Sequence, residues 1–354
     1  MRARRIAGFA ALALILAGVA GIASKMRMPD TFFYTRAAEK MINAGCAEIH
    51  CFRVLVPWIV GAVPGPTVLK WKTYSVLANA AAALAVFDLS LLLGLSARTA
   101  AIAAALTGLG FGSFYTLWEP FDSDPLMFWL TPLVLRWALE ARFAAATTAA
   151  SIGVFAKEIV VAPFAIVAIV DAWERRWPDA FRAVRSGAIA FAVWFGLHVF
   201  LRFVFDYSYG ANTSPHIFSG AGLVPWLHNM SGRGALSAMF NEFGAPYLLF
   251  PFGFLAAPPK LRRLAVASLP FACIFAYVQQ PDRALWNFHF VTSPLAALAL
   301  EPMADAFIVL FLAVYAFANL KVGAQVPWIP HARYAFAIGL VLAAVAAWRT
   351  VRRR

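Results

Sequence analysis

Apolar runs dominate the chain, and its polar residues gather in short stretches between them. Judged by their length and by the charges that bound them, these runs predict about twelve helical membrane crossings. The predicted spans are residues 6–24, 73–94, 99–118, 125–141, 143–156, 159–171, 186–205, 236–256, 264–279, 286–300, 304–320 and 333–349. We therefore expect an all-α, polytopic membrane helix bundle, with residues 1–354 forming a single transmembrane domain.

Two of these runs are too short to cross a bilayer, and two charged residues separate them. Phe143–Ala156 and Ile159–Val170 would each be about 20 Å long as helices, against a hydrocarbon core of roughly 30 Å. Lys157 and Glu158 would then lie below the membrane surface. A charge at that depth costs at least ~2.5 kcal/mol unless it is paired or hydrated, which makes the step a candidate functional site. The simpler interpretation is that Lys157 and Glu158 only neutralise each other.

The basic residues between spans favour a short hairpin over residues 143–171 rather than one kinked span. If this segment crossed once, the loop after it would face outward, unless Val54–Val63 also crossed. With a hairpin, both termini are expected in the cytoplasm, and the protein is expected in the cell inner membrane. The internal loops and tail then hold Arg2, Arg4, Arg5, Arg98, Arg136, Arg142, Arg175, Arg176, Arg182, Arg185, Lys260, Arg262, Arg263, Arg349 and residues 352–354.

Composition supports this class and excludes others. The chain is 62% hydrophobic and 13% charged, with a mean hydropathy of +0.73, which is too apolar for a soluble protein of this size. Its net charge of +13 is accounted for by the internal loops, so we expect no nucleic-acid partner. Two alternatives stay open. Met1–Ala23 is an uncleaved first span or a signal peptide, and Cys46 and Cys51 form a disulfide or stay unpaired.

The first external loop, residues 25–72, contains a predicted amphipathic helix. Tyr34 and Ala38 begin an apolar face with helical spacing, Asp30 is placed as an N-cap, and Gly45 as a stop. We expect this helix to lie in the membrane interface. The loop is also basic, which would attract an anionic head group or a sugar phosphate; its cations are Lys25, Arg27, Arg36, Lys40, Arg53, Lys70 and Lys72.

The polar residues expected on the external side form four groups. Several have plainer roles: Asp124 precedes Pro125 and fits an N-cap, whereas Asp122 has no such role, and Arg53 or Arg283 would serve as interfacial anchors. The histidines lack ligand spacing, so we predict no structural metal site. The groups are Asp30 with Glu48, His50 and Arg53; residues 118–125, with Glu119, Asp122 and Asp124; Lys157 with Glu158; and residues 281–283 with Trp286 and His289.

These features together resemble the GT-C superfamily of integral membrane glycosyltransferases. The likeness covers roughly the first half of the chain. It rests on a first span followed by Asp30 and a long external loop, on the acidic stretch Glu119–Asp124 that opens a later span, and on the short hairpin with Lys157 and Glu158. It implies an enzyme that transfers a sugar from a polyprenyl-phosphate donor to an external glycan, lipid or protein of the cell envelope.

The resemblance also implies roles for the candidate residues. Asp30 is the first choice for the catalytic base and Asp122 the second, and in-line attack would invert the anomeric centre. Lys157, Arg53 and Arg283 would bind the phosphate, since positioned cations stabilise charge strongly in a dry site. Supporting roles fall to Glu158, Asp124, Glu119 and His289. No cofactor is required; a divalent metal bridging Asp30, Asp122 or Asp124 to the phosphate is compatible with this chemistry.

Two other classes of function remain as alternatives. A transporter or flippase for an anionic lipid or solute fits the many spans and the broken hairpin. It predicts charges spread through the bilayer and an internal repeat, whereas the polar residues here crowd toward one face. A structural subunit of a membrane assembly is the third alternative.

Overall fold

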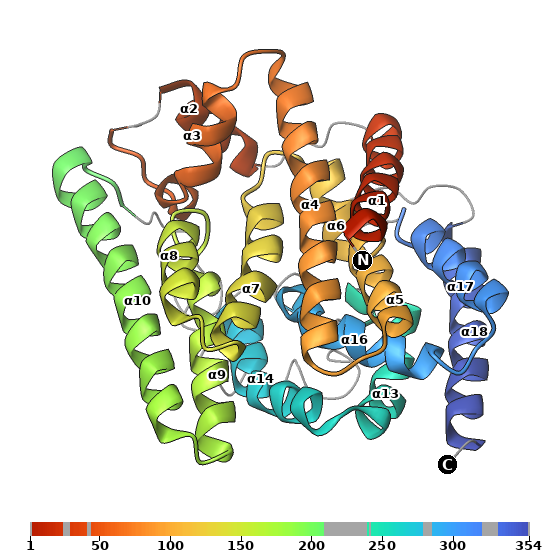
Figure 1. Ribbon diagram of the computed structural model, residues 1–354. Coiled ribbons are helices and arrows are strands. Elements are labelled where there is room, and N and C mark those ends of the chain that lie inside the picture. The colour runs from red at the N-terminus through yellow and green to blue at the C-terminus, as the bar shows by residue number, and fades with distance from the viewer. Residues whose placement is uncertain are drawn as a thin grey trace. The chain divides into compact units, whose positions relative to one another are not determined.

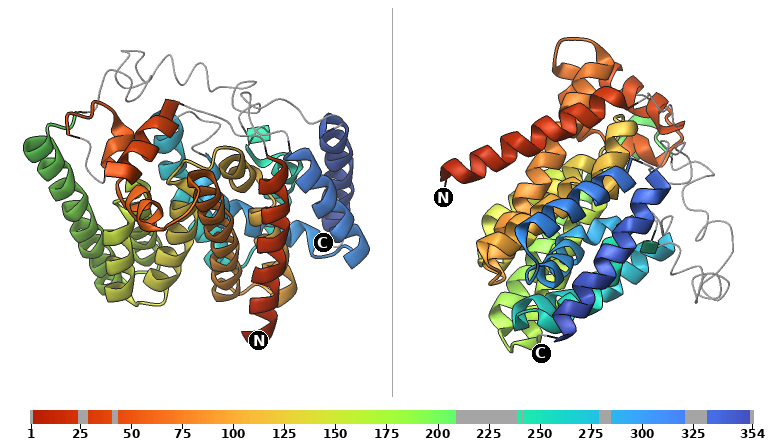
Figure 2. Two further views of the ribbon diagram at one scale, coloured as in Figure 1. Left: turned by 90° about the horizontal axis from the view of Figure 1, so that it is seen from above. Right: turned by 90° about the vertical axis from the view of Figure 1, so that its right-hand side faces the viewer.

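The computed structural model describes residues 2–23, 29–40, 44–208, 239–240, 242–278, 285–320 and 332–352. No strand occurs within these ranges, and an isolated bridge joins Ala47 to Ser208. The all-α prediction is confirmed for them. The chain divides into two compact units, which are described separately (Figures 1 and 2). Unit 1 comprises Met1–Leu12, Ala83–Tyr115 and Ser219–Arg354, and unit 2 comprises Ala13–Ala82 and Thr116–Phe218.

Unit 2 holds the residues predicted to form the first external loop and the short hairpin. Its helices are α2 (Pro29–Lys40), η1 (Ile49–Phe52), α3 (Leu55–Ala62), α7 (Asp124–Leu139), α8 (Phe143–Gly153), η2 (Glu158–Val161), α9 (Ala162–Trp173) and α10 (Trp177–Phe205). Three further helices contain residues of both units: α1 (Arg2–Ile22), α4 (Thr67–Leu92) and α6 (Phe111–Trp118).

Unit 1 holds the remaining helices. They are α5 (Ala97–Gly108), η3 (Ala245–Leu249), α13 (Phe250–Ala256), α14 (Pro259–Val278), η4 (Leu285–Phe288), α16 (His289–Leu300), α17 (Asp305–Ala318) and α18 (Ala332–Arg352).

Among the described residues, five helices are long and apolar enough to cross a membrane. They are Arg5–Ile22, Thr67–Leu92, Ala97–Trp118, Trp177–Phe205 and Ala332–Arg352, and shorter apolar helices accompany them. The helical, apolar character of the protein is thereby confirmed, while the count of about twelve crossings and the single-domain organisation stay predictions.

The chain turns back between α8 and α9 at the Lys157-Glu158 step, while the hairpin as a membrane topology stays a prediction. Helices α8 and α9 both pack against α7 and α10 in unit 2 (Figure 1). The turns that lead from α7 to α8 and from α9 to α10 have the same hydrogen-bond pattern, with Ala141 and Arg175 at φ of 57° and 60°. Because each turn is short, α8 runs back along α7 and its end returns to the level where α7 begins.

Helices α2 and α3 lie side by side in unit 2 (Figure 2). Gly61 of α3 permits this approach, because a Cβ atom there would collide with the backbone of Ala38 in α2. A helix is confirmed over Pro29–Lys40, and residues 41–43 lie outside the described residues. Its buried face includes Tyr34 and Ala37, so this face packs on protein.

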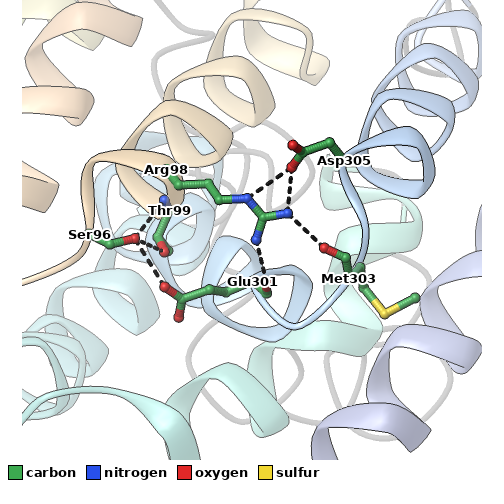
Figure 3. A network of polar contacts seen from close by, with 6 residues as sticks. All are labelled: Ser96, Arg98, Thr99, Glu301, Met303 and Asp305. Carbon is green, nitrogen blue, oxygen red and sulfur yellow. Dashed lines mark hydrogen bonds and ion pairs between the residues drawn. The ribbon is translucent and has the colours of Figure 1, made fainter.

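In unit 1, Arg98 fastens the start of α5 to the loop between α16 and α17 (Figure 3). Its Nε donates to Asp305 at 3.0 Å, and its guanidinium also donates to the backbone oxygens of Glu301 and Met303. The hydroxyl of Ser96 donates to the Glu301 carboxylate at 3.0 Å. Two loops that were both expected on the internal side thus lie together.

Candidate functional site

The acidic stretch between α6 and α7 is buried and shaped by its own hydrogen bonds. Glu119, Asp122 and Asp124 are all buried, although carboxylates seldom are unless they are paired. One Asp122 carboxylate oxygen accepts the backbone N–H of Asp124 at 3.2 Å. Asp122 therefore shapes the turn that leads into α7, a local role that the sequence did not suggest for it. Asp124 is the first residue of α7, and the N-cap position belongs to Ser123.

Asp124 instead pairs with the cation of the hairpin break. The Lys157 ammonium donates to the Asp124 carboxylate, and the two side chains are only 6% and 9% exposed. This contact joins the first residue of α7 to the step between α8 and η2. A buried lysine and a buried aspartate thus occur together at one end of unit 2, where burial would be costly for either alone.

Glu158 pairs elsewhere, with Arg53, which directly follows η1. Arg53 Nη2 lies 3.5 Å from Glu158 Oε1. The backbone of Lys157 is extended, with φ −164° and ψ 137°, and neighbouring side chains of an extended chain point in opposite directions. Lys157 and Glu158 therefore reach different partners. The interpretation that they only neutralise each other was wrong.

The disulfide between Cys46 and Cys51 closes the loop that precedes Arg53. Phe52 stacks on His198 of α10 with ring centroids 4.4 Å apart and meets Tyr207 edge-on. Backbone hydrogen bonds from Gly45 to Phe205 and from Ser208 to Cys46 add to this attachment. The segment before Arg53 is thereby held against the end of α10, which gives the guanidinium a defined position.

An aromatic cluster supports the charged residues from within unit 2. Tyr34 of α2, Trp71 of α4 and Phe121 form a buried core together with apolar residues of α3. The Trp71 ring centroid lies 6.2 Å from that of Tyr34 and 5.6 Å from that of Phe121. Tyr34 also meets the ring of His50 at 5.7 Å. Four segments that are distant in sequence are therefore fixed around the charges.

Tyr74 holds the beginning of α7 in place. Its hydroxyl accepts the backbone N–H of Leu126 at 3.0 Å and donates to the backbone oxygen of Ser123 at 3.3 Å. It thereby satisfies one of the free N–H groups of the first helical turn, as a capping residue does. Sequence reasoning missed Tyr74 because it lies inside a predicted membrane span. There its ring was treated as part of the apolar run, and the hydrogen bonds of its hydroxyl were not considered.

The charges act on the ionisation of two residues in the external loop. Burial raises the pKa of the Tyr34 phenol well above its usual value, partly opposed by Arg53, so the hydroxyl stays protonated and can donate. Burial alone would lower the pKa of Arg53, but Glu158, Tyr34 and Asp124 together outweigh it and the net shift is upward. Arg53 is therefore a permanent cation.

Three other predicted site residues are Asp30, Arg283 and His289. Asp30 is the second residue of α2, one turn before Tyr34, but its side chain lies outside the described residues, as does all of Arg283. His289 is buried in unit 1, where its Nδ1 lies 3.0 Å from the backbone oxygen of Trp286. Within the described ranges, no group of three or more His, Cys, Asp or Glu residues is arranged to hold a metal ion.

Comparison with known proteins identifies the fold. No family model and no curated protein matches the chain. Among solved structures, the chain shares its fold with an archaeal oligosaccharyltransferase.

The solved structures are of the archaeal oligosaccharyltransferase of Archaeoglobus fulgidus. Its apo form matches with a TM-score of 0.51 and 14% identity, over 97% of this chain and 56% of that one. A complex of the same enzyme, AglB, with an inhibitory peptide and a dolichol-phosphate matches with a TM-score of 0.50 and 14% identity, over 98% and 56%. The chain thus spans a little over half the length of these proteins.

Proposed function

We propose that the protein is a membrane glycosyltransferase that moves a sugar from a polyprenyl-phosphate donor to an external acceptor. The observation that carries the proposal is the buried charged cluster of unit 2, in a fold shared with an oligosaccharyltransferase. The dolichol-phosphate in one of those structures supports a lipid-linked donor here. The acceptor is a glycan, a lipid or a protein, and the inhibitory peptide in that structure supports a peptide.

The residues divide the chemistry between them. A phosphate leaving group needs positive charge more than it needs an acid, and Lys157 and Arg53 supply this charge in a water-poor site. The acceptor hydroxyl needs a general base, for which Asp30 remains the first choice because it lies one turn before Tyr34 on α2. Asp122 is the second choice. Direct attack would invert the anomeric centre.

Three further parts of the proposal concern additional residues, a metal ion and the location of the protein. Arg283 would add a third cation for the phosphate, with His289 and Glu119 in support. A divalent metal is optional. The disulfide between Cys46 and Cys51 favours an oxidising, external location for this end of unit 2 in a cell inner membrane, with both termini cytoplasmic.

A transporter of anionic lipids is not favoured, because the solved structures that share the fold are glycosyltransferases. The described charges of the candidate site also meet at one end of unit 2, whereas a transport pathway would distribute them through the bilayer.

The decisive experiment compares the glycolipids and envelope glycans of cells with and without the protein by mass spectrometry. We expect one hexose or pentose to be missing from the acceptor and its polyprenyl-phosphate donor to accumulate. Wild type should restore the product and Asp30→Asn should not, with Asp179→Asn as a matched control near the start of α10. Purified protein that moves the donor lipid across vesicles but transfers no sugar would overturn the proposal in favour of a flippase.

A further inference from the structure

Each cation of the cluster already has a carboxylate partner. Lys157 is paired with Asp124, and Arg53 with Glu158. Asp122 adds another buried carboxylate beside them. A phosphate that entered this arrangement would meet more negative charge than positive charge. Binding an anion here therefore requires one carboxylate to leave its cation.

The two ion pairs differ in how readily they open. The side chains of Lys157 and Asp124 are both less than a tenth exposed, so separating them would strand buried charges. The Arg53–Glu158 pair is longer, at 3.5 Å, and the Glu158 side chain is 35% exposed. Glu158 can therefore turn toward water more readily than Asp124, provided that another anion takes its place at Arg53. Arg53, at 11% exposure, cannot follow it.

Arg53 has a neighbour that also suits an incoming anion. The buried guanidinium of Arg53 and the buried hydroxyl of Tyr34 interact with each other directly. Within the described part of the chain, neither the Arg53 Nε nor the Tyr34 hydroxyl reaches a well-formed hydrogen bond. Buried donors are nearly always satisfied, so two neighbouring donors with hydrogen-bonding capacity to spare suit a group rich in acceptor oxygens. A phosphate has this chemistry, whereas a single sugar hydroxyl would satisfy only one of them.

We infer that Glu158 is a displaceable counter-ion, which holds Arg53 until a phosphate group replaces it at Arg53 and Tyr34. The inference rests on the proposed function for its ligand class, a polyprenyl phosphate or its head group. It assigns Glu158 a role opposite to that of a structural ion-pair partner. A structural partner stabilises the bound state, but a counter-ion competes with the ligand and weakens its apparent affinity.

The test measures the dissociation constant of the full-length protein, in phosphatidylcholine nanodiscs, for undecaprenyl monophosphate and for inorganic pyrophosphate. Glu158→Gln should tighten binding about fivefold, because Arg53 is then available at all times rather than in a minority of molecules. Glu140→Gln is the matched control. Glu140 directly follows α7, at the end away from the cluster, and its Oε1 also pairs with an arginine, at 2.9 Å from Arg136 Nε. Its affinity should equal that of wild type.

Two further variants link the effect to the assigned residues. Tyr34→Phe should weaken binding severalfold, and Glu158→Gln should bring no gain when Arg53 is already glutamine. A gain with the lipid alone places a lipid head group in the site, and a gain with both probes shows that the phosphate suffices. Glu158→Ala repeats the test should the glutamine variant fold poorly.

Unchanged or weaker binding in the Glu158 variants, with either probe, overturns the inference. The transfer assay separates this result from a failure of the proposed function. A fivefold gain in affinity without sugar transfer would support Glu158 as a counter-ion and refute the proposed enzymatic function. Sugar transfer without any gain in affinity would support the enzymatic function and refute the counter-ion role.

Discussion

Replacing Lys157 by methionine should separate the structural role of the buried ion pair from its catalytic role. The variant leaves Asp124 without its cation in a site where both side chains are less than a tenth exposed. Removing one partner of such a pair costs about 3–5 kcal/mol, because the remaining charge stays desolvated and uncompensated. We expect the free energy of unfolding of Lys157→Met to fall by that amount, which corresponds to roughly 10 °C in Tm.

A second substitution then restores stability but not activity. In Lys157→Met with Asp124→Asn, no uncompensated charge remains, and replacing both charges of a buried pair is often close to neutral. The double variant should regain most of the lost stability. It still lacks the cation proposed to stabilise the departing phosphate, so its transfer rate should stay ~100-fold or more below wild type.

The assays are thermal unfolding in detergent, followed by tryptophan fluorescence, and transfer of sugar from a synthetic polyprenyl-phosphate donor. A double variant that unfolds and transfers like wild type would show that Lys157 only balances Asp124. A single variant that unfolds at the wild-type temperature would show that the pair does not stabilise the protein, and the estimate above would be wrong.

Three further outcomes follow from the same contacts. Tyr74→Phe removes the hydroxyl that links α4 to the first turn of α7, so Tm should fall with a loss of ~1–3 kcal/mol and the transfer rate should fall with it. Gly61→Ala should cost ~1–3 kcal/mol by calorimetry through its collision with Ala38, whereas Gly196→Ala, which meets open space, should not destabilise. A cysteine in place of Glu174 should react with an impermeant maleimide from the cytoplasmic side alone; labelling from outside would contradict the hairpin topology.

The break between α8 and α9 was predictable because two independent constraints meet there. Hydrocarbon thickness makes runs as short as residues 143–156 and 159–171 unable to cross, and the basic loops set the direction of the chain on either side. Both constraints depend on local sequence. The pairing of Lys157 with Asp124 and of Glu158 with Arg53 was not predictable, because their partners lie 33 and 105 residues away.

Charges that looked like a ligand-attracting surface prove to have local structural partners. Lys72 donates to the backbone oxygens of Ala20 and Ala23 at the end of α1, and Lys70 to those of Gly61 and Val63 at the end of α3. A cation at a helix C-terminus satisfies free carbonyls and the helix dipole. Sequence alone could not distinguish these lysines from Arg53, because the helix ends that they cap come from other segments.

The extended step at Lys157 explains why the hairpin breaks at two charges rather than turning through small polar residues. In a continuous helix, Lys157 and Glu158 would be about 100° apart and would face much the same surroundings. The extended backbone sends one side chain to α7 and the other to the segment behind the disulfide. Because both ion pairs start from adjacent residues, a ligand that takes Arg53 from Glu158, as we infer, would also release one of the two ion pairs at the hairpin tip. The other ion pair, the backbone hydrogen bond from Leu55 to Phe155 and the burial of Ala156 would keep the tip in place.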